Sequence, residues 1–328
     1  LTVFAEEYEI DAPGVDADRG DFDPFAGGGA IPLEAQRLGL EAHAHDLNPV
    51  AVMINKAMIE IPPKFAGRSP VNPEAQRQGA ANQGWKGAAG LAEDVRYYGE
   101  WMKQEACKRI GHLYPKAKLE DGSEATVIAW IWARTVKCPN PACGCEMPLA
   151  SSYVLSKKKG KCAWIEPHVY GEKVEYTVHQ GDKLGKVVEP KKGRGATFVC
   201  PSCGETTLDA YVKDEGKAGR MGAQLMAIVA EGKHGREYLA PTAEHIHAAE
   251  VDKPDDYPDG AMPTNPRWFS PPAFGMTDYS QLFTNRQLTA LTTFSAMVGE
   301  AQQKAEADAV AAGVFNDHIA LSEGGSGA

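Results

Sequence analysis

The chain has 328 residues, of which 43% are apolar and 24% are charged, and this composition is that of an ordinary globular protein with room for two domains. It excludes disordered and fibrous classes. No stretch reaches the roughly 20 uninterrupted apolar residues that a membrane helix needs, and the N-terminal LTVFAEEYEIDAPG lacks the basic start and apolar run of a signal peptide. We therefore expect a cytoplasmic location and no membrane partner.

The net charge of −10 argues against a nucleic-acid binder when the chain is taken as a whole. The charge is unevenly distributed, because residues 137–220 hold 14 Lys and Arg against 10 Asp and Glu. Any surface that faces phosphate groups is therefore expected in this middle segment. The chain begins with Leu and reaches a glycine-rich motif within its first 30 residues, so we expect a fragment of a longer protein.

The first elements have the strand, helix, strand, helix order that is typical of a parallel sheet. They are a strand at 21–25, a helix at 30–38 closed by Gly39, a strand at 41–46, and a helix from 49 that Pro62 and Pro63 stop. The composition of residues 66–90 predicts a loop, and apolar periodicity predicts a long helix over 91–113.

From residue 124 the pattern changes to strands, in the segments ATVIAWIWARTV, SSYVL and VEYTVHQ. This all-β region ends near Asp209. Residues 224–240 are expected to form a helix and a strand, and the Pro- and Asp-rich stretch after them is expected to be irregular. The last regular element is predicted as a helix over 285–312.

The strongest short motif is the turn that ends the first strand, made of Asp23, Pro24, Phe25, Ala26, Gly27, Gly28 and Gly29. Open α/β sheets bind ligands at the carboxyl ends of their strands, where glycine lets the backbone approach closely. Asp46 comes 19 positions after Gly27, at the end of the second strand, and this spacing suits a carboxylate that accepts hydrogen bonds from a ribose. The alternative interpretation is a tight strand-to-helix turn with a capping aspartate.

The seven cysteines include two tight pairs, which in a cytosolic chain favour metal ligation over disulfides. Cys138 and Cys143 lie in CPNPACG, and Cys200 and Cys203 lie in CPSCG. The neighbouring Pro and Gly are typical of tight knuckles, and four thiolates from two knuckles complete a tetrahedral zinc site. Cys145 is a rival ligand. Buried cysteines without a metal are the alternative, but they explain neither the clustering nor the neighbours.

Basic residues cluster between the two cysteine pairs, with Tyr and Trp interleaved. The basic members are Lys157, Lys158, Lys159, Lys161, Lys191, Lys192 and Arg194. Charge runs are usually solvated surface. The alternative is a face beside the cysteine site that contacts phosphates.

The segment DPFAGGG resembles motif I of the DNA methyltransferases that modify amino groups. The chain as a whole is similar to one family. The resemblance extends from DPFAGGG through the run that continues to AHDLNPVAVMINKAMIEIPPKFAG, and includes EDVRYYGEWM, the cysteine pairs, SKKKGK and FSPPAFGM…LFTNRQLTALTTF. This family is the large adenine-specific DNA methyltransferases that contain a zinc ribbon, found in bacterial and archaeal modification and phage-defence loci. The resemblance covers nearly everything after about residue 20.

The resemblance implies an α/β fold: a partial, Rossmann-like core that depends on S-adenosylmethionine, with an inserted all-β zinc-ribbon domain. It divides the chain into a cofactor-binding part at 1–123, the zinc-ribbon insert at 124–222, and a linker with a C-terminal helical segment at 223–328. The implied cofactors are S-adenosyl-L-methionine and Zn²⁺. The implied partners are double-stranded DNA and other subunits of a modification or defence system.

The resemblance also assigns roles at the glycine-rich turn. Asp23, Phe25, Gly27 and Gly29 would contact the methionine part of the cofactor. Asp46 would contact its ribose, and Asn48 would lie beside the adenine. Pro24, Ala26 and Gly28 belong to the same motif.

A catalytic motif is missing from the sequence. Amino-group methylation commonly uses [DNS]-P-P-[YFW], whose polar group holds the target amine and whose ring stacks on a flipped base. The nearest match is Ser270-Pro271-Pro272-Ala273, followed by Phe274. We expect this segment not to be the catalytic turn and the chain alone to be inactive. The alternative function is a non-catalytic zinc-ribbon module that binds nucleic acid, with a vestigial methyltransferase fold. A third function, that of an NAD-dependent oxidoreductase, would need a GxGxxG turn, which the glycine run does not match.

Overall fold

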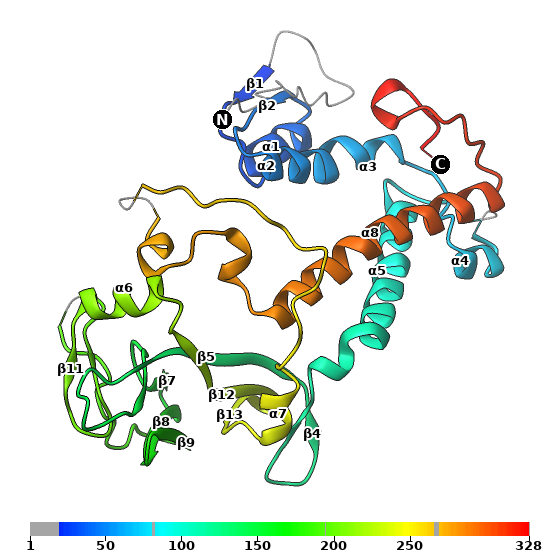
Figure 1. Ribbon diagram of the computed structural model, residues 1–328. Coiled ribbons are helices and arrows are strands. Elements are labelled where there is room, and N and C mark those ends of the chain that lie inside the picture. Colours follow the sequence, from blue (N-terminus) through cyan, green and yellow to red (C-terminus); the bar gives the residue numbers. More distant parts are fainter. Residues whose placement is uncertain (1–19, 81–82, 194, 266–268, 328) are drawn as a thin grey trace. The chain divides into compact units, whose positions relative to one another are not determined.

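The computed structural model describes residues 20–80, 83–193, 195–265 and 269–327. The contacts of the chain gather in two compact units (Figure 1). Unit 1 comprises residues 1–105 and 296–328, and unit 2 comprises residues 106–295. The units thus divide after residues 105 and 295, whereas the expected regions divide after residues 123 and 222; that expected division stays a sequence-based prediction.

Unit 1 begins with two parallel strands, β1 (Gly20–Asp23) and β2 (Glu41–Ala44), paired from Gly20 opposite Glu41 to Asp23 opposite Ala44. The connection between them is α1 (Ala30–Arg37), which ends at Gly39 with a left-handed φ of 75°. The predicted strand, helix, strand order is therefore confirmed. Parallel strands with a crossover helix are common to many α/β folds, so the Rossmann-like core remains a prediction.

The helix after β2 does not stop at Pro62 and Pro63 as predicted. It runs as α2 (Pro49–Asn55), a π-helical turn η1 (Lys56–Glu60) and α3 (Ile61–Lys64). Proline lacks the backbone N–H that an α-helix needs from its second turn onward. Here a new α-helical segment begins after the π turn, so both prolines lie in the first turn of α3. Pro63 has no N–H to donate to the carbonyl of Ile59, and this carbonyl instead accepts a hydrogen bond from Gln36 Nε2 at 3.3 Å.

The remaining helices of unit 1 are two long ones and a short one. The predicted loop over 66–90 contains α4 (Pro73–Arg77), which begins at Asn72 as N-cap. The predicted long helices are confirmed as α5 (Ala89–Ile110), followed by the 3₁₀ turn η3 (Gly111–Leu113), and α8 (Asn285–Ala311), each of which spans the boundary between the units. A 3₁₀ turn, η6 (Leu321–Glu323), lies near the C-terminus.

Unit 2 is built on antiparallel strands. A curled four-stranded sheet has the order β13-β12-β5-β6, and a three-stranded sheet has the order β7-β8-β9. The strands of these two sheets are β5 (Val127–Lys137), β6 (Glu146–Pro148), β7 (Val154–Lys158), β8 (Lys161–Tyr170), β9 (Lys173–Gly181), β12 (Gly222–Gly232) and β13 (Gly235–Leu239). Two short hairpins pair β3 (Ala117–Lys118) with β4 (Glu124–Ala125) and β10 (Phe198–Val199) with β11 (Thr206–Thr207).

The short helices of unit 2 are α6, α7 and the 3₁₀ turns η4 and η5. Their bounds are Asp209–Lys217, Ala243–His247, Pro271–Phe274 and Tyr279–Leu282. The Pro- and Asp-rich stretch before η4 is irregular in its described residues, as predicted.

The segment 224–232 is a strand, so the predicted helix there is wrong. The run of Leu, Met and Ala at 225–230 is almost wholly buried, and a short apolar run of this kind fits a buried strand as well as a helix. The pairing partners decide the outcome: β12 lies between β5 and β13, and a tight hairpin closes where Gly232 pairs with Gly235. The strand β8 between β7 and β9 was also not foreseen.

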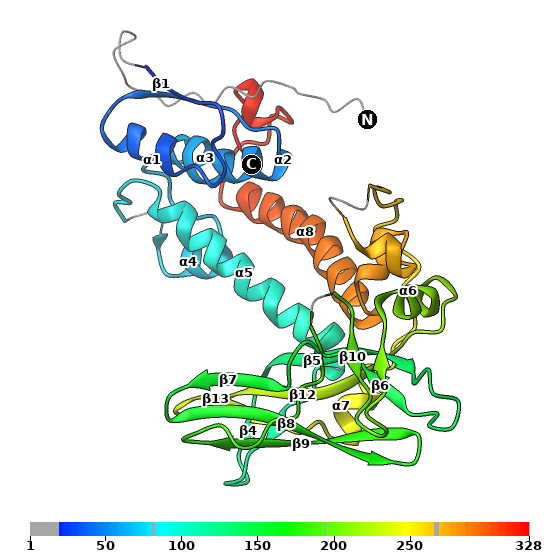
Figure 2. The same cartoon turned by 90° about the vertical axis from the view of Figure 1, so that its left-hand side faces the viewer.

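The core of unit 2 lies on both faces of β5 and β12. On one face, Ala133, Met226 and Ala227 pack against Tyr153 and Ile165 of the β7–β9 region; Figure 2 shows these strands side by side. On the other face, a second cluster contains Ala125, Val127, Leu225 and Ile228 with Trp130 and Trp132 packed against it. The strand β5 therefore presents its tryptophans to the face opposite β7–β9.

Candidate cofactor turn and metal centre

The glycine-rich turn continues the pairing of the two parallel strands. The N–H of His45 donates to the carbonyl of Asp23, and the N–H of Ala26 donates to the carbonyl of His45, both at 2.9 Å. Gly27 and Gly29 then adopt left-handed φ values of 51° and 81°, which side chains disfavour. The chain thus turns sharply into α1 at the carboxyl ends of the strands.

Asp46 lies against this turn. Its Oδ2 accepts the N–H of Gly27 at 2.8 Å, and its Oδ1 accepts the N–H of Asn48 at 2.8 Å. These two bonds, that from Asn48 first, hold the pKa of the Asp46 carboxyl below its ordinary value. The residue is partly exposed, and each carboxylate oxygen keeps a lone pair for a further donor.

The other residues of the expected site have local structural roles. The Oδ1 of Asp23 accepts the N–H of Phe25 at 3.0 Å, which fixes the start of the turn. The ring of Phe25 is 80% exposed. The Oδ1 of Asn48 caps α2 by accepting the N–H of Val50 at 3.0 Å.

Asn55 contacts this turn from α2, and this role was not predicted from the sequence. It lies at the end of α2 and is only 1% exposed. Its Nδ2 donates to the carbonyls of Gly27 at 3.1 Å and Ala51 at 2.8 Å, so it ties the turn to the helix. A polar residue at a buried position of an apolar helix was the available signal.

The four expected metal ligands come from two hairpin turns. Cys138 and Cys143 lie between β5 and β6, where the N–H of Cys138 donates to the carbonyl of Cys145 at 2.8 Å. Cys200 and Cys203 lie between β10 and β11, where the N–H of Cys200 donates to the carbonyl of Glu205 at 2.8 Å.

The structure brings these four thiols together. Their sulfur atoms all lie within 4.8 Å of one another, and the separations are 3.6 Å for Cys138–Cys203 and 3.8 Å for Cys143–Cys200. Four cysteines in this arrangement could hold a metal ion. A tetrahedral Zn–S₄ site with bonds of about 2.3 Å has sulfur atoms about 3.8 Å apart, so the donor set fits Zn²⁺.

The fifth cysteine of the cluster, Cys145, has a different role from the four. It is fully buried, and burial raises the pKa of its thiol to about 12. Its backbone N–H, in contrast, faces the Cys143 sulfur and is the main reason that the pKa of Cys143 falls to about 7. The four sulfur atoms that lie close together are those of the four cysteines expected as ligands, and Cys145 is not among them.

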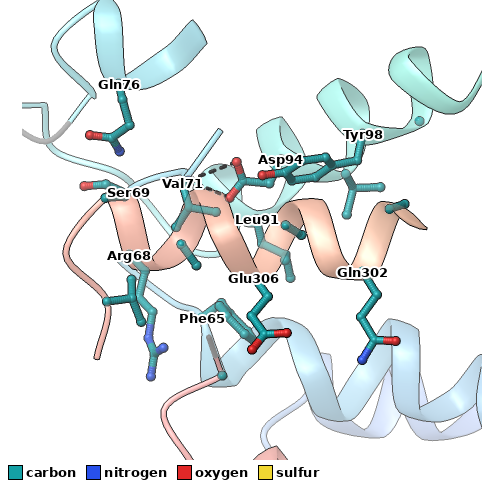
Figure 3. A pocket seen from close by; sticks show the side chains of 18 of the residues that line it. Phe65, Arg68, Ser69, Val71, Gln76, Leu91, Asp94, Tyr98, Gln302 and Glu306 are labelled. Carbon is teal, nitrogen blue, oxygen red and sulfur yellow. Dashed lines mark hydrogen bonds between the residues drawn. The ribbon is translucent and has the colours of Figure 1, made fainter. Parts of the chain in front are cut away.

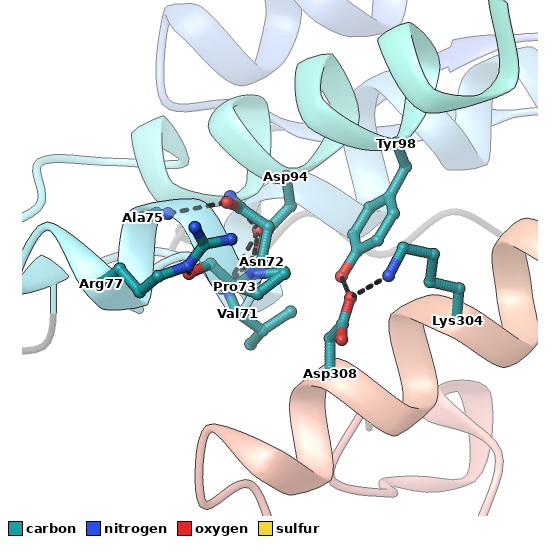
Figure 4. Close-up of polar contacts among 9 residues, drawn as sticks. All are labelled: Val71, Asn72, Pro73, Ala75, Arg77, Asp94, Tyr98, Lys304 and Asp308. Atoms are coloured by element: carbon teal, nitrogen blue, oxygen red, sulfur yellow. Dashed lines mark hydrogen bonds and ion pairs between the residues drawn. The ribbon is translucent and has the colours of Figure 1, made fainter. Parts of the chain in front are cut away.

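An apolar cavity of about 890 Å³ lies in unit 1 between α5, α8 and the segment 65–71 (Figure 3). Several of its polar side chains bond to backbone groups or to residues outside the lining. Asp94 accepts the backbone N–H groups of Val71 and Asn72 at 2.8 to 2.9 Å, and the hydroxyl of Tyr98 donates to Asp308 at 3.1 Å (Figure 4). The pKa of the Tyr98 hydroxyl is raised, mainly because the side chain is partly buried and also because of the hydrogen bond to Asp308. The lining is mostly apolar, with Arg68, Asp94 and Glu306 as its charged members.

The segment Ser270-Pro271-Pro272 is used for packing in unit 2. It opens η4, and Phe274 packs against the core around the cysteines while Lys213 lies 5.7 Å from its ring centroid. Gly216 of α6 touches this segment so closely that a Cβ there would meet the Phe274 carbonyl at 2.2 Å. The ring of Phe274 is thus already in contact with other side chains of unit 2.

Comparisons with known proteins identify no relative. No model of a protein family matches the chain, and no curated protein and no solved structure gives a significant match. Within the described ranges, no helix is long and apolar enough to cross a membrane.

Proposed function

We propose that this chain is part of an S-adenosylmethionine-dependent methyltransferase that modifies the N6 of adenine in DNA, with a zinc ion held by its four clustered cysteines. The observation that carries the proposal is the contact between Asp46 and Gly27. It puts a partly exposed carboxylate beside a glycine-rich turn at the carboxyl ends of two parallel strands, the place where α/β sheets bind nucleotide-like ligands.

The turn suits such a ligand in three respects. Gly28 has only open space around the position of a Cβ, so a ligand can approach the backbone. Asp46 has lone pairs for two ribose hydroxyls. The exposed ring of Phe25 offers an apolar surface next to the turn. When bound, S-adenosylmethionine supplies an activated methyl group, and the residues of this chain would hold and orient it.

Zinc would have a structural role, because all four positions are filled by cysteine sulfur and none is left for a substrate. We expect about one equivalent of zinc per chain. Elemental analysis of purified protein tests this, and a Cys200→Ser, Cys203→Ser double variant should lose the metal. A zinc content near zero, or one unchanged in the double variant, would contradict the assignment.

Cofactor binding tests the main proposal. Calorimetry with S-adenosylhomocysteine should detect binding, and Asp46→Ala should weaken it by about 1–3 kcal/mol, the cost of losing hydrogen bonds to a charged group. The matched control is Glu34→Ala, which removes an exposed carboxylate from α1 that pairs only with Arg37 among the described residues. Absence of binding by protein that circular dichroism shows to be folded would overturn the proposal.

We expect no methyl transfer by this chain alone. The nearest match to a catalytic turn, Ser270-Pro271-Pro272, packs on α6, and the ring of Phe274 contacts the core of unit 2. A flipped base needs both a polar clamp and a free aromatic face. Transfer of radiolabelled methyl groups to mixed-sequence DNA measures this. Activity that disappears in Phe274→Ala but persists in a folded Tyr211→Phe control would make that segment the active site.

A further inference from the structure

A second cavity, of about 930 Å³, lies wholly within unit 2. Its walls come from β5, from Ala223 of β12, from Tyr114, and from the segment 282–287 that leads into α8. The volume is within the usual range of ligand sites, about 300–1,000 Å³. None of its lining residues belongs to the glycine-rich turn or to the cysteine cluster.

The strand β5 gives one wall an unusual composition. Trp130, Trp132 and Arg134 occur at every second position, so they lie on one face of the strand, and all three line the cavity. Phe283 lines it from the segment before α8 and is 39% exposed. Trp130, Trp132 and Phe283 thus line the cavity beside an exposed arginine.

A second arginine is buried in the same cavity wall. Arg286 is 4% exposed, and its guanidinium lies 4.7 Å from the ring centroid of Trp130 and 4.9 Å from that of Tyr114. Its Nη1 donates to the carbonyl of Leu113 at 2.9 Å. Among the described residues neither Arg286 nor Arg134 forms an ion pair, and none of those lining the cavity is acidic.

A buried cation without a carboxylate is costly, and burial lowers the pKa of Arg286. An anion would compensate this cost. The first turn of α8 also faces the cavity through Asn285, Arg286 and Gln287, and the start of a helix of this length carries partial positive charge. The cavity thus combines aromatic side chains with two arginines and the start of a long helix.

We propose that this cavity binds an unstacked base of a single-stranded nucleic acid, with the aromatic walls stacking on the base and the two arginines holding the adjoining phosphate. Stacking on aromatic rings beside basic groups is how proteins hold single strands. Arg134 and Phe283 line the cavity and are both exposed, so the cavity is open to solvent where a strand would enter. Unit 2 also carries 24 Lys and Arg against 22 Asp and Glu, whereas the rest of the chain carries 10 against 22.

The inference uses residues of unit 2 alone and does not rest on the proposed methyltransferase activity. Its test contains no S-adenosylmethionine, so failure of one proposal is distinguishable from failure of the other. Fluorescence anisotropy with a labelled single-stranded oligothymidylate and the zinc-loaded full chain measures binding. A duplex of the same length and free thymidine monophosphate as competitor are the comparison arms.

Two variants separate stacking from charge. Phe283→Ala should weaken single-strand binding on the order of tenfold without changing its salt dependence. Arg134→Gln should also weaken binding, and should reduce the slope of log affinity against log salt by about 0.7, the value for one phosphate contact on a single strand. Tyr170→Ala and Arg236→Gln are the controls, because both residues are exposed in unit 2 and lie outside the cavity.

The expected result is loss in the two cavity variants and affinity within twofold of the parent in the two controls. No binding by the folded parent protein would overturn the proposal, as would equal affinity in all variants. Equal weakening of duplex binding by Phe283→Ala would show that the ring does not contact an unstacked base. Competition by thymidine monophosphate at the affinity of the oligonucleotide would assign the cavity to a free nucleotide and likewise overturn it.

Discussion

Gly29 and Asn55 constrain each other at the glycine-rich turn. Gly29 has a left-handed φ of 81°, and a Cβ there would lie 2.5 Å from Oδ1 of Asn55. Asn55 is in turn fixed by its two bonds to the carbonyls of Gly27 and Ala51. The turn therefore has little freedom to adapt at Gly29, whereas Gly28 is open.

This contrast predicts different outcomes for two neighbouring substitutions. Gly29→Ala should destabilise the turn by about 1–3 kcal/mol, because it adds both backbone strain and a steric clash. Gly28→Ala should change stability by less than about 0.5 kcal/mol, as is usual for exposed positions. Hydrogen–deuterium exchange of peptides covering 20–60 reports the local effect. Equal protection in the two variants would contradict this account.

At this scale the sequence singled out Asp46 and the four cysteines because a glycine-rich turn and a cysteine knuckle have recognisable spacings. The structure brings the four sulfur atoms together, and the cofactor contact of Asp46 stays a prediction. Asn55 and Asp94 were not singled out, because each acts on backbone groups 22 to 28 residues away. Such contacts depend on how elements pack. A polar residue in an apolar helix was a signal for Asn55, but local spacing does not identify the partner of either residue.

At the scale of elements, Asp94 anchors the segment before α4 to α5. The carboxylate accepts both N–H groups at 71 and 72 and also the side-chain amide of Asn72, which in turn caps α4. Residues predicted as a plain loop are thus ordered by one buried carboxylate. Elements whose signal is local, such as α1, α5 and α8, were predicted. The helix assigned to β12 was wrong because strand pairing outweighed local preference.

Replacing Asp94 should therefore release this segment. In Asp94→Ala the N–H groups of Val71 and Asn72 lose their partner while partly or wholly buried, and we expect a loss of about 2–3 kcal/mol in local stability. The control is Glu93→Ala, whose carboxylate is on the surface and pairs with Arg96. Limited proteolysis within 66–90 measures the difference. Cleavage at the same rate in both variants would show that Asp94 does not hold the segment.

At the scale of the whole molecule, the chain consists of two units with separate cores. The cluster around the cysteines contains Val136, Met147, Phe198 and Val212 and belongs to unit 2 alone. The strands β10 and β11 have two residues each, and an isolated hairpin of that length is not stable in water. A metal ion that joins the two knuckles would therefore supply part of the stability of this region.

Removal of the metal should consequently affect one unit and not the other. A strong chelator should increase hydrogen–deuterium exchange in β6, β10, β11 and α6, because metal binding contributes directly to folding where the ligands come from different segments. Exchange in β1, β2 and α1 should stay unchanged, since their contacts lie in unit 1. Cys203→Ser should reproduce the effect without chelator. Cys107→Ser is the matched control, because this exposed thiol lies on α5 outside the four-cysteine cluster. Equal changes in both units, or protection in β10 and β11 that survives loss of the metal, would contradict a structural site confined to unit 2.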